Sequence, residues 1–296
     1  MTADAIAVLM PGDMGHAVGR ALGQNGHRVI TCLAGRSGHT RDLARTGGLT
    51  DLGSLDAVVE GASLVLSILP PTAALGLAED VVQAMERTGA KPVYVDCNAV
   101  SPGTVKDIAA IIEVVGAPFI DAGIIGMAPG RGAGPRFYVS GADTGPMEAL
   151  DGKGFEVKAI GAGTGRASAL KMCYAGLTKG TWTLHTAVLL AAEAQGLTAE
   201  LWDEFAHSQV EALAQMESRQ HRLAADSERW ICEMEEIART FADAGVTPAF
   251  HQGAAEIFRL LAETPFASET RETIDESRTV EETIRTTARL LPKTGG

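Results

Sequence analysis

The chain has 296 residues, of which 46% are hydrophobic and 21% charged, so it is long enough for two domains of ordinary globular composition. Its net charge of −12 argues against binding to nucleic acid or to anionic membranes, because both normally require a basic surface. The longest apolar runs, such as 63–69, are too short to span a membrane, and the N-terminus lacks the pattern of an export signal. Four scattered cysteines favour free thiols in the cytoplasm, and the histidines show no metal-ligand spacing.

The first half alternates short apolar runs with helical segments. The run 5–10 is continuously apolar, as expected of a strand buried on both faces of a parallel sheet. The expected strands are 5–10, 27–33, one near Leu49, 63–69, 92–96, 119–121, 136–140 and 155–160. The helices between them are expected from Gly12 to Leu22 and over 40–45, 55–60, 72–87 and 103–115. This order predicts an α/β fold with a doubly wound, mostly parallel Rossmann sheet in residues 1–162.

A glycine turn follows the first strand and opens a helix. Strand, turn, helix and strand within about 30 residues are typical of a dinucleotide-binding unit, in which glycine admits the pyrophosphate to the helix N-terminus. The pattern lacks one element, because Met10 stands where the first glycine of GxGxxG belongs. An ordinary strand-turn-helix is the alternative. The predicted cofactor residues of this turn are Gly12, Asp13, Met14 and Gly15.

The end of the second strand bears on the choice of cofactor. An acidic residue there binds the ribose hydroxyl of NAD, whereas this chain has Arg36 and Ser37, with Arg41 one turn further on. Arginine binds phosphate through charge-assisted hydrogen bonds, which favours NADP(H) over NAD(H). A solvated loop arginine is the alternative interpretation.

Further ligand contacts are expected where other parallel strands end. Leu69 and Pro70 close the fourth strand, because proline stops the ladder and leaves a loop at the carboxyl edge. Asn98 follows the fifth strand and is placed to reach the nicotinamide ribose, or alternatively to form an Asx turn. The glycine-rich segment 122–135 is expected to be a loop near substrate and cofactor.

Four segments in order resemble the β-hydroxyacid dehydrogenase and 6-phosphogluconate dehydrogenase superfamily. They are the glycine turn, the strand 64–70 ending in Leu-Pro, the segment 95–102, and the segment 119–126 with the glycines that lead to Lys171. The resemblance implies a substrate-binding segment after the sixth strand, which gives Ile124 and Gly126 as substrate residues. Two positions depart from the family: Ile125 replaces a serine, and Ala175 replaces an asparagine. The segment 229–238 resembles an atypical branch with a different C-terminal domain. Imine reductases are a related group that commonly lacks the lysine.

The resemblance makes Lys171 the catalytic residue. Hydride transfer to a carbonyl leaves an alkoxide, and an ammonium group there donates the proton; neutral lysine removes it in reverse. A helix places Tyr174 and Thr178 on the same face as Lys171, so both are predicted substrate residues. A lysine that extends to the surface is the alternative. Lys179 is interpreted as structural or as a dimer contact.

The second half is expected to be an all-α domain, residues 163–296. Its helices are predicted over 166–195, from 198 to about 225, from 226 to about 245, over 249–262 and over 280–291. Its apolar helices suggest a homodimer. Met234 and His251 are assigned to the substrate cleft, with helix packing as the alternative.

The sequence therefore predicts an NADP-dependent oxidoreductase that interconverts a hydroxyl and a carbonyl on a small substrate. Two alternatives stay open: an imine reductase-like enzyme, and a non-catalytic NADP-binding regulatory protein.

Overall fold

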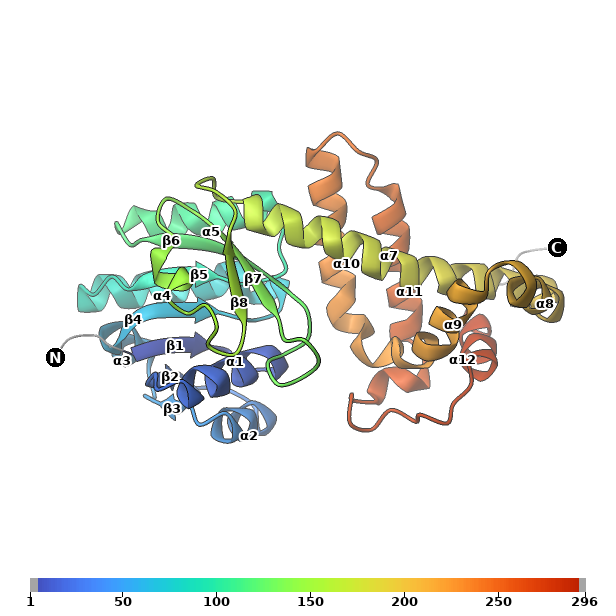
Figure 1. The fold of residues 1–296 in the computed structure, drawn as a ribbon, viewed down its shortest axis with the longest axis horizontal. Helices are drawn as coiled ribbons and strands as arrows, with labels where there is room; N and C mark the ends of the chain where they lie inside the picture. Colours follow the sequence, from blue (N-terminus) through green and yellow to red (C-terminus); the bar gives the residue numbers. More distant parts are fainter. Residues whose placement is uncertain (1–4, 293–296) are drawn as a thin grey trace. The chain divides into compact units, whose positions relative to one another are not determined.

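A computed structural model describes residues 5–292 (Figure 1). Contacts divide the chain into two compact units, the first ending at Met172 and the second beginning at Cys173. Helix α7 (Arg166–Gln195) begins in the first unit and continues in the second. The helix has the predicted limits, whereas the domain boundary at 162/163 stays a prediction. Within residues 5–292, no helix combines the length and the apolar composition that a membrane crossing requires.

The first unit is built on one eight-stranded sheet with the order β3-β2-β1-β4-β5-β6-β7-β8. All neighbouring strands are parallel except β6 and β7, which run antiparallel. The strands are β1 (Ala5–Leu9), β2 (Val29–Thr31), β3 (Thr50–Asp51), β4 (Ala62–Ser67), β5 (Val93–Asp96), β6 (Phe119–Ile125), β7 (Arg136–Ser140) and β8 (Glu156–Ala159). The predicted doubly wound, mostly parallel sheet is therefore confirmed.

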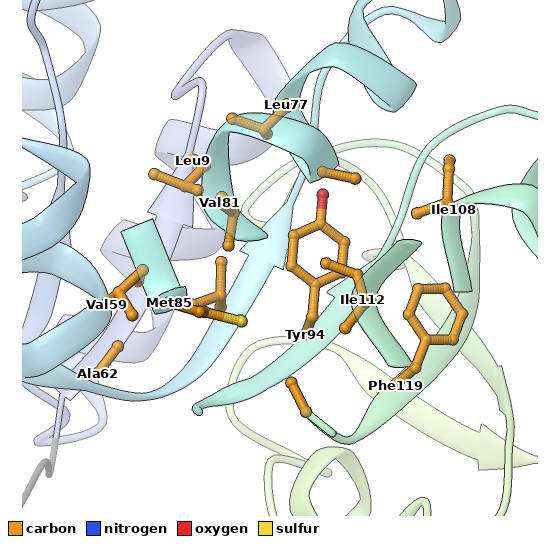
Figure 2. Packing of buried hydrophobic residues seen from close by; sticks show 14 of the residues in the cluster. Leu9, Val59, Ala62, Leu77, Val81, Met85, Tyr94, Ile108, Ile112 and Phe119 are labelled. Atoms are coloured by element: carbon orange, nitrogen blue, oxygen red, sulfur yellow. The ribbon is translucent and has the colours of Figure 1, made fainter. Parts of the chain in front are cut away.

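Both faces of this sheet are covered, which explains why its strands are apolar throughout. In β1, Ala5, Ala7 and Leu9 join one core cluster, while Ile6 and Val8 join the other. Figure 2 shows the first cluster, in which Tyr94 and Phe119 pack with side chains of α3, α4 and α5. The helices of this unit are α1 (Asp13–Gln24), α2 (Gly38–Thr46), α3 (Leu55–Gly61), the 3-10 turn η1 (Pro71–Ala73), α4 (Ala74–Thr88), α5 (Pro102–Val114) and α6 (Gly145–Glu148).

The strand order reverses between β1 and β4. In open α/β sheets, ligands bind at the carboxyl edge beside such a switch point. Three loops meet that edge, following β1, β2 and β4. These loops, together with the first turn of α1, contain the predicted cofactor residues except Asn98.

The second unit is helical in its described part. After α7 it contains α8 (Thr198–Ser208), α9 (Val210–Arg219), η2 (Gln220–Arg222), η3 (Ala224–Asp226), α10 (Ser227–Asp243), α11 (Ala249–Ala262), η4 (Pro265–Ser268) and α12 (Val280–Ala288). Trp230 of α10 packs against both Trp182 and Phe258, with ring centroids 5.3 and 5.2 Å apart. The aromatic packing ties α7, α10 and α11 together.

Two predicted elements differ from the structure. Residues 122–125 were expected to begin a loop, but they continue β6, because their backbone groups pair with the antiparallel β7. The helix expected from 198 to about 225 is interrupted at Gln209, whose backbone is not helical (φ −134°, ψ 44°). Just before it, the Ser208 hydroxyl hydrogen-bonds the carbonyl of Glu204, a local bond that competes with the helix ladder.

Candidate active site

The turn after β1 leaves an open cradle at the start of α1. Gly12 is the N-cap of α1 and provides no side-chain cap for the helix. A Cβ atom built on Gly12 meets nothing within 4 Å, whereas one on Gly15 lies 3.1 Å from the Met10 carbonyl oxygen. Gly12 therefore leaves room outside the turn, and Gly15 lets α1 approach β1 closely. Asp13 is exposed and Met14 half-buried beside them.

Met10 takes the backbone conformation that the missing glycine would normally provide. Its φ is +63°, and it is the only non-glycine residue with positive φ in the described chain, 5–292. Its carbonyl oxygen accepts a hydrogen bond of 2.7 Å from the Gly12 N–H, which closes the turn. The glycine turn is thus complete in geometry despite the different residue.

Glycine is expected to be the more stable residue at position 10 when compared with alanine. A left-handed backbone conformation costs an L-residue about 1–2 kcal/mol. The free energy of unfolding of Met10→Gly should therefore exceed that of Met10→Ala by about 1 kcal/mol. At an ordinary position alanine is the more stabilising of the two. Urea unfolding of both variants measures the difference. An alanine variant as stable as the glycine variant would contradict the strain at Met10.

A cavity of about 490 Å³ lies beyond the ends of β1 and β2. Met10, Cys32, Ala34 and Arg36 line one part of it. Residues of α3 and α4 line the rest, including Asp56 and Arg87, which form an ion pair of 2.6 Å. The cavity has the position and the size of a nucleoside pocket next to the glycine cradle.

The two arginines at the loop after β2 differ from each other in their contacts. Arg41 donates to the carbonyl oxygens of Leu33 at 2.7 Å and Arg36 at 3.2 Å, so it braces the loop. Ser37 caps α2, its hydroxyl accepting from the Thr40 N–H at 3.2 Å. The exposed Arg36 guanidinium makes no hydrogen bond or ion pair with any residue in the described part of the chain. Arg36 is therefore the cationic group that this loop presents to the cavity.

Asn98 is buried in a polar network instead of being exposed at the strand edge. Its side-chain oxygen accepts from the Leu69 N–H at 2.8 Å, and its amide group donates to Ser67 at 2.9 Å and Asp96 at 2.7 Å. The Asx turn at this point is made by Asp96, whose carboxylate accepts from the Asn98 N–H at 3.1 Å. Asn98 thus fixes the loop after β4, which contains Leu69 and the exposed Pro70.

Asp96 is fully buried in this network. Burial raises its pKa to about 7, and the hydrogen bonds from Asn98 oppose the rise. The next strand places a second buried carboxyl, Asp121, directly opposite it. Burial also raises the pKa of Asp121, while its donors at Ser168, Ser140 and Gly165 act in the other direction.

Lys171 is half-buried near the start of α7, within the first unit. The helix lies directly on β6: a Cβ on Gly123 would come within 2.7 Å of the Ala167 carbonyl oxygen and 2.9 Å of the Lys171 Cβ. Ile124 is buried in the core, while Gly126 is exposed, with φ +115° in a turn against Gly134. The predicted catalytic lysine therefore lies against β6, and Gly126 lies just past the end of that strand.

The remaining predicted residues belong to the second unit. Tyr174 is 48% exposed, and the Thr178 hydroxyl donates to backbone carbonyls of its own helix. Met234 is fully buried among the helices, as is most of His251, which packs against Phe241. A substrate contact for any of them stays a prediction. Lys179 is buried and forms an ion pair of 2.7 Å with Glu233, as expected of a structural lysine.

Three features of this region are not among the predicted residues: Asp96, Asp121 and the close approach at Gly123. A signal was present for the carboxyls, because each ends or interrupts an otherwise apolar strand. Charged residues are rarely buried without partners, so such positions indicate a polar network.

A doubly wound sheet with a glycine cradle at its switch point, and a nucleoside-sized cavity beside it, defines a dinucleotide-binding protein. Residues 5–151 match the NAD binding domain of 6-phosphogluconate dehydrogenase, and residues 192–261 match the domain of unknown function DUF1932. The chain therefore combines an NAD-binding domain of the 6-phosphogluconate dehydrogenase type with a DUF1932 domain, and the family resemblance seen in the sequence is confirmed.

Curated relatives match over part of their length. An uncharacterized 28.5 kDa protein of Methanothermus fervidus is 30% identical over 58% of this chain and 65% of its own. The 3-hydroxyisobutyrate dehydrogenase of Pseudomonas aeruginosa is 31% identical over 48% of this chain and 47% of its own. The chain thus spans less than two thirds of these relatives.

Solved structures match over most of the chain. The conserved protein MTH1747, reported to be structurally similar to 3-hydroxyacid dehydrogenases, is 28% identical with a TM-score of 0.63, covering 87% of this chain and 96% of its own. An imine reductase of Streptomyces aurantiacus shares the fold at 19% identity and a TM-score of 0.54, covering 95% of this chain and 98% of its own.

Proposed function

We propose that the protein is an NADP-dependent oxidoreductase that interconverts a hydroxyl and a carbonyl group on a small substrate, with Lys171 as its general acid and base. The observation that carries the proposal is the contact of α7 with β6 at Gly123. This contact holds Lys171 against β6, whose carboxyl end lies at the same edge of the sheet as the glycine cradle after β1. The relative named as a 3-hydroxyisobutyrate dehydrogenase and the reported similarity of MTH1747 to 3-hydroxyacid dehydrogenases support the reaction type.

Lys171 supplies the proton chemistry of this reaction. The hydride chemistry would be supplied by the nicotinamide when it is bound. In the reducing direction, the Lys171 ammonium hydrogen-bonds the carbonyl oxygen and passes a proton to it as negative charge develops. In the oxidising direction, neutral Lys171 takes the proton from the hydroxyl group. The residues of the cradle would hold the cofactor without taking part in the proton transfer.

The residues present fit a dinucleotide. Gly12 keeps the space outside the turn free, and the cavity beyond Met10 accommodates the adenosine half. Gly12, Asp13, Met14 and Gly15 would hold the pyrophosphate, with the loop of Leu69 and Pro70 facing it from β4. Asn98 acts through that loop.

Loss of Arg36 is expected to weaken NADPH binding selectively. A hydrogen bond to a charged group contributes about 1.5–3 kcal/mol, so Arg36→Ala should raise the Kd of NADPH roughly 10-fold or more. NADH lacks the 2′-phosphate and should bind almost unchanged. Arg45→Ala provides the control, because Arg45 lies on α2, the helix that follows this loop, and is exposed and paired with Asp42. Titration of both cofactors measures the ratio, and an equal loss for both would refute a role in cofactor choice.

The substrate side is proposed to involve Ile124, Gly126, Tyr174, Thr178 and Met234. Ile125 and Ala175 replace polar residues of the family, which favours a substrate with an apolar substituent. We also propose a cytoplasmic homodimer. All four cysteines are free, which suits a reducing compartment.

Imine reduction is the second candidate, favoured by the shared fold with an imine reductase. A screen of hydroxy acids, keto acids and cyclic imines, followed through the absorbance of NADPH, separates the two. Turnover of hydroxy or keto acids is the expected result. Turnover of imines alone would favour the second candidate, and cofactor binding without turnover would favour a regulatory protein.

A further inference from the structure

We infer that Asp121 is a positioning residue that holds the first turns of α7 on β6 and so fixes Lys171 at the carboxyl edge of the sheet. The inference rests on the proposed function for the role of Lys171. Its structural part stands on contacts within the first unit alone.

The Asp121 carboxylate accepts hydrogen bonds from two segments, the start of α7 and strand β7. Its Oδ2 atom accepts from the N–H groups of Gly165, Ala167 and Ser168 at 2.9, 3.0 and 3.2 Å, and from the Ser140 hydroxyl at 2.9 Å. Its Oδ1 atom accepts from the Ser168 hydroxyl at 2.7 Å. Three of these donors are backbone N–H groups, which can only donate, so the arrangement favours the carboxylate form.

These contacts cap α7 with a residue far away in the sequence. The helix begins at Arg166, and its first N–H groups have no partner inside the helix. Asp121 satisfies them from the middle of β6, and its negative charge also suits the positive end of the helix dipole. A local N-cap would satisfy the same groups without attaching the helix to the sheet. The cap supplied by Asp121 therefore also attaches the start of α7 to β6.

The geometry of β6 connects the Asp121 contacts with the position of Lys171. Alternate residues of a strand share a face, so Gly123 lies on the same side of β6 as Asp121. The absent side chain of Gly123 allows the Ala167 carbonyl and the Lys171 Cβ to lie against the strand. Asp121 thus fixes the beginning of the helix, and Gly123 sets its distance from the sheet at the lysine.

The neighbouring carboxyl serves a different loop. Asp96 lies opposite Asp121 in the sheet, but its bonds go to Asn98, which holds Leu69 after β4. The two acids therefore support different sides of the proposed site: Asp96 the cofactor loop and Asp121 the lysine. The pair offers a matched comparison of substitutions at equal depth in one sheet.

The anchor can be tested without activity by amide hydrogen exchange. In Asp121→Asn, the negative charge that strengthens the hydrogen bonds from the backbone N–H groups of α7 is lost, so residues 165–171 should exchange at least ~10-fold faster than in the wild type. Asp96→Asn should leave this segment protected. Ser168→Ala removes a single donor and should show a smaller change at the same place, which covers the case that Asp121→Asn fails to fold. Unchanged exchange at 165–171 in both Asp121→Asn and Ser168→Ala overturns the anchor.

Kinetics test the consequence for Lys171. Misplacement by about 1 Å can cost up to 100-fold in rate, so Asp121→Asn should lower kcat at least ~10-fold, with little change in the KM of NADPH. Since Asp121 acts through the lysine, Asp121→Asn combined with Lys171→Ala should be no slower than Lys171→Ala alone. If the two substitutions lowered kcat independently, so that their effects multiplied in the double variant, the positioning role of Asp121 would be overturned. A fully active Lys171→Ala would overturn the proposed function instead, and the exchange result would still report on the anchor.

Discussion

Replacing Lys171 with alanine is expected to lower kcat by roughly 100-fold or more, the usual contribution of a positioned acid or base. Cofactor binding should persist, because the cradle and the cavity are formed by the turn after β1 and the loop after β2. The loss arises because the developing alkoxide no longer has a proton donor beside it. Steady-state kinetics with the best substrate of the screen, together with an NADPH titration, measure both quantities.

Lys179 provides the matched control on the same helix. Its ammonium pairs with the buried Glu233, and breaking a buried pair costs about 3–5 kcal/mol. Lys179→Ala should therefore lower the Tm while the folded enzyme keeps its kcat. Lys171→Ala should instead lower kcat in the folded enzyme. If Lys171→Ala turned over at the wild-type rate, another group would have to supply the proton.

The second large effect is expected at Gly12, where valine should abolish cofactor binding without unfolding the protein. The backbone of Gly12 (φ −78°, ψ −163°) is open to any residue, and its Cβ position is unobstructed. A valine side chain would occupy the space of the pyrophosphate and remove two or more hydrogen bonds to its charge. Each contributes about 1.5–3 kcal/mol, so the Kd should rise roughly 100-fold or more.

Gly15→Val separates this effect from a loss of packing. A side chain there meets the Met10 carbonyl and Val8 of β1, so overpacking should cost about 1–3 kcal/mol of unfolding free energy. For Gly12→Val the unfolding free energy should stay within about 0.5 kcal/mol of the wild type. Chemical denaturation and cofactor titration of both variants test the contrast. Intact binding by Gly12→Val would place the pyrophosphate elsewhere.

Local patterns were sufficient to predict most of the fold. Continuous apolar strands indicated a sheet covered on both faces. The end of α7 before Gly196 and the start of α11 after Pro248 also follow the sequence. The glycine turn was also predictable, although Met10 obscured it. The sequence alone does not give backbone angles. It therefore could not show that Met10 adopts the left-handed conformation, which is costly for a residue other than glycine.

Contacts between distant segments were beyond the reach of the sequence. Asp121 and Ala167 lie 46 residues apart, and their hydrogen bond follows from the pairing of β6 with β7 and the position of α7. The extension of β6 through Ile125 has the same origin, because a glycine-rich segment becomes a strand only when a neighbour satisfies its backbone. Asn98 was placed at the correct edge, but its burial depends on Ser67 and Asp96.

A crystal structure of the protein with NADP⁺ and the substrate found by the screen tests the central claim most directly. The Lys171 Nζ atom should lie within about 3 Å of the reacting oxygen, the range of a proton-transferring hydrogen bond. The 2′-phosphate should lie at Arg36 and the pyrophosphate at Gly12. A reacting oxygen held by other residues, with Lys171 directed away from it, would contradict the role assigned to the lysine.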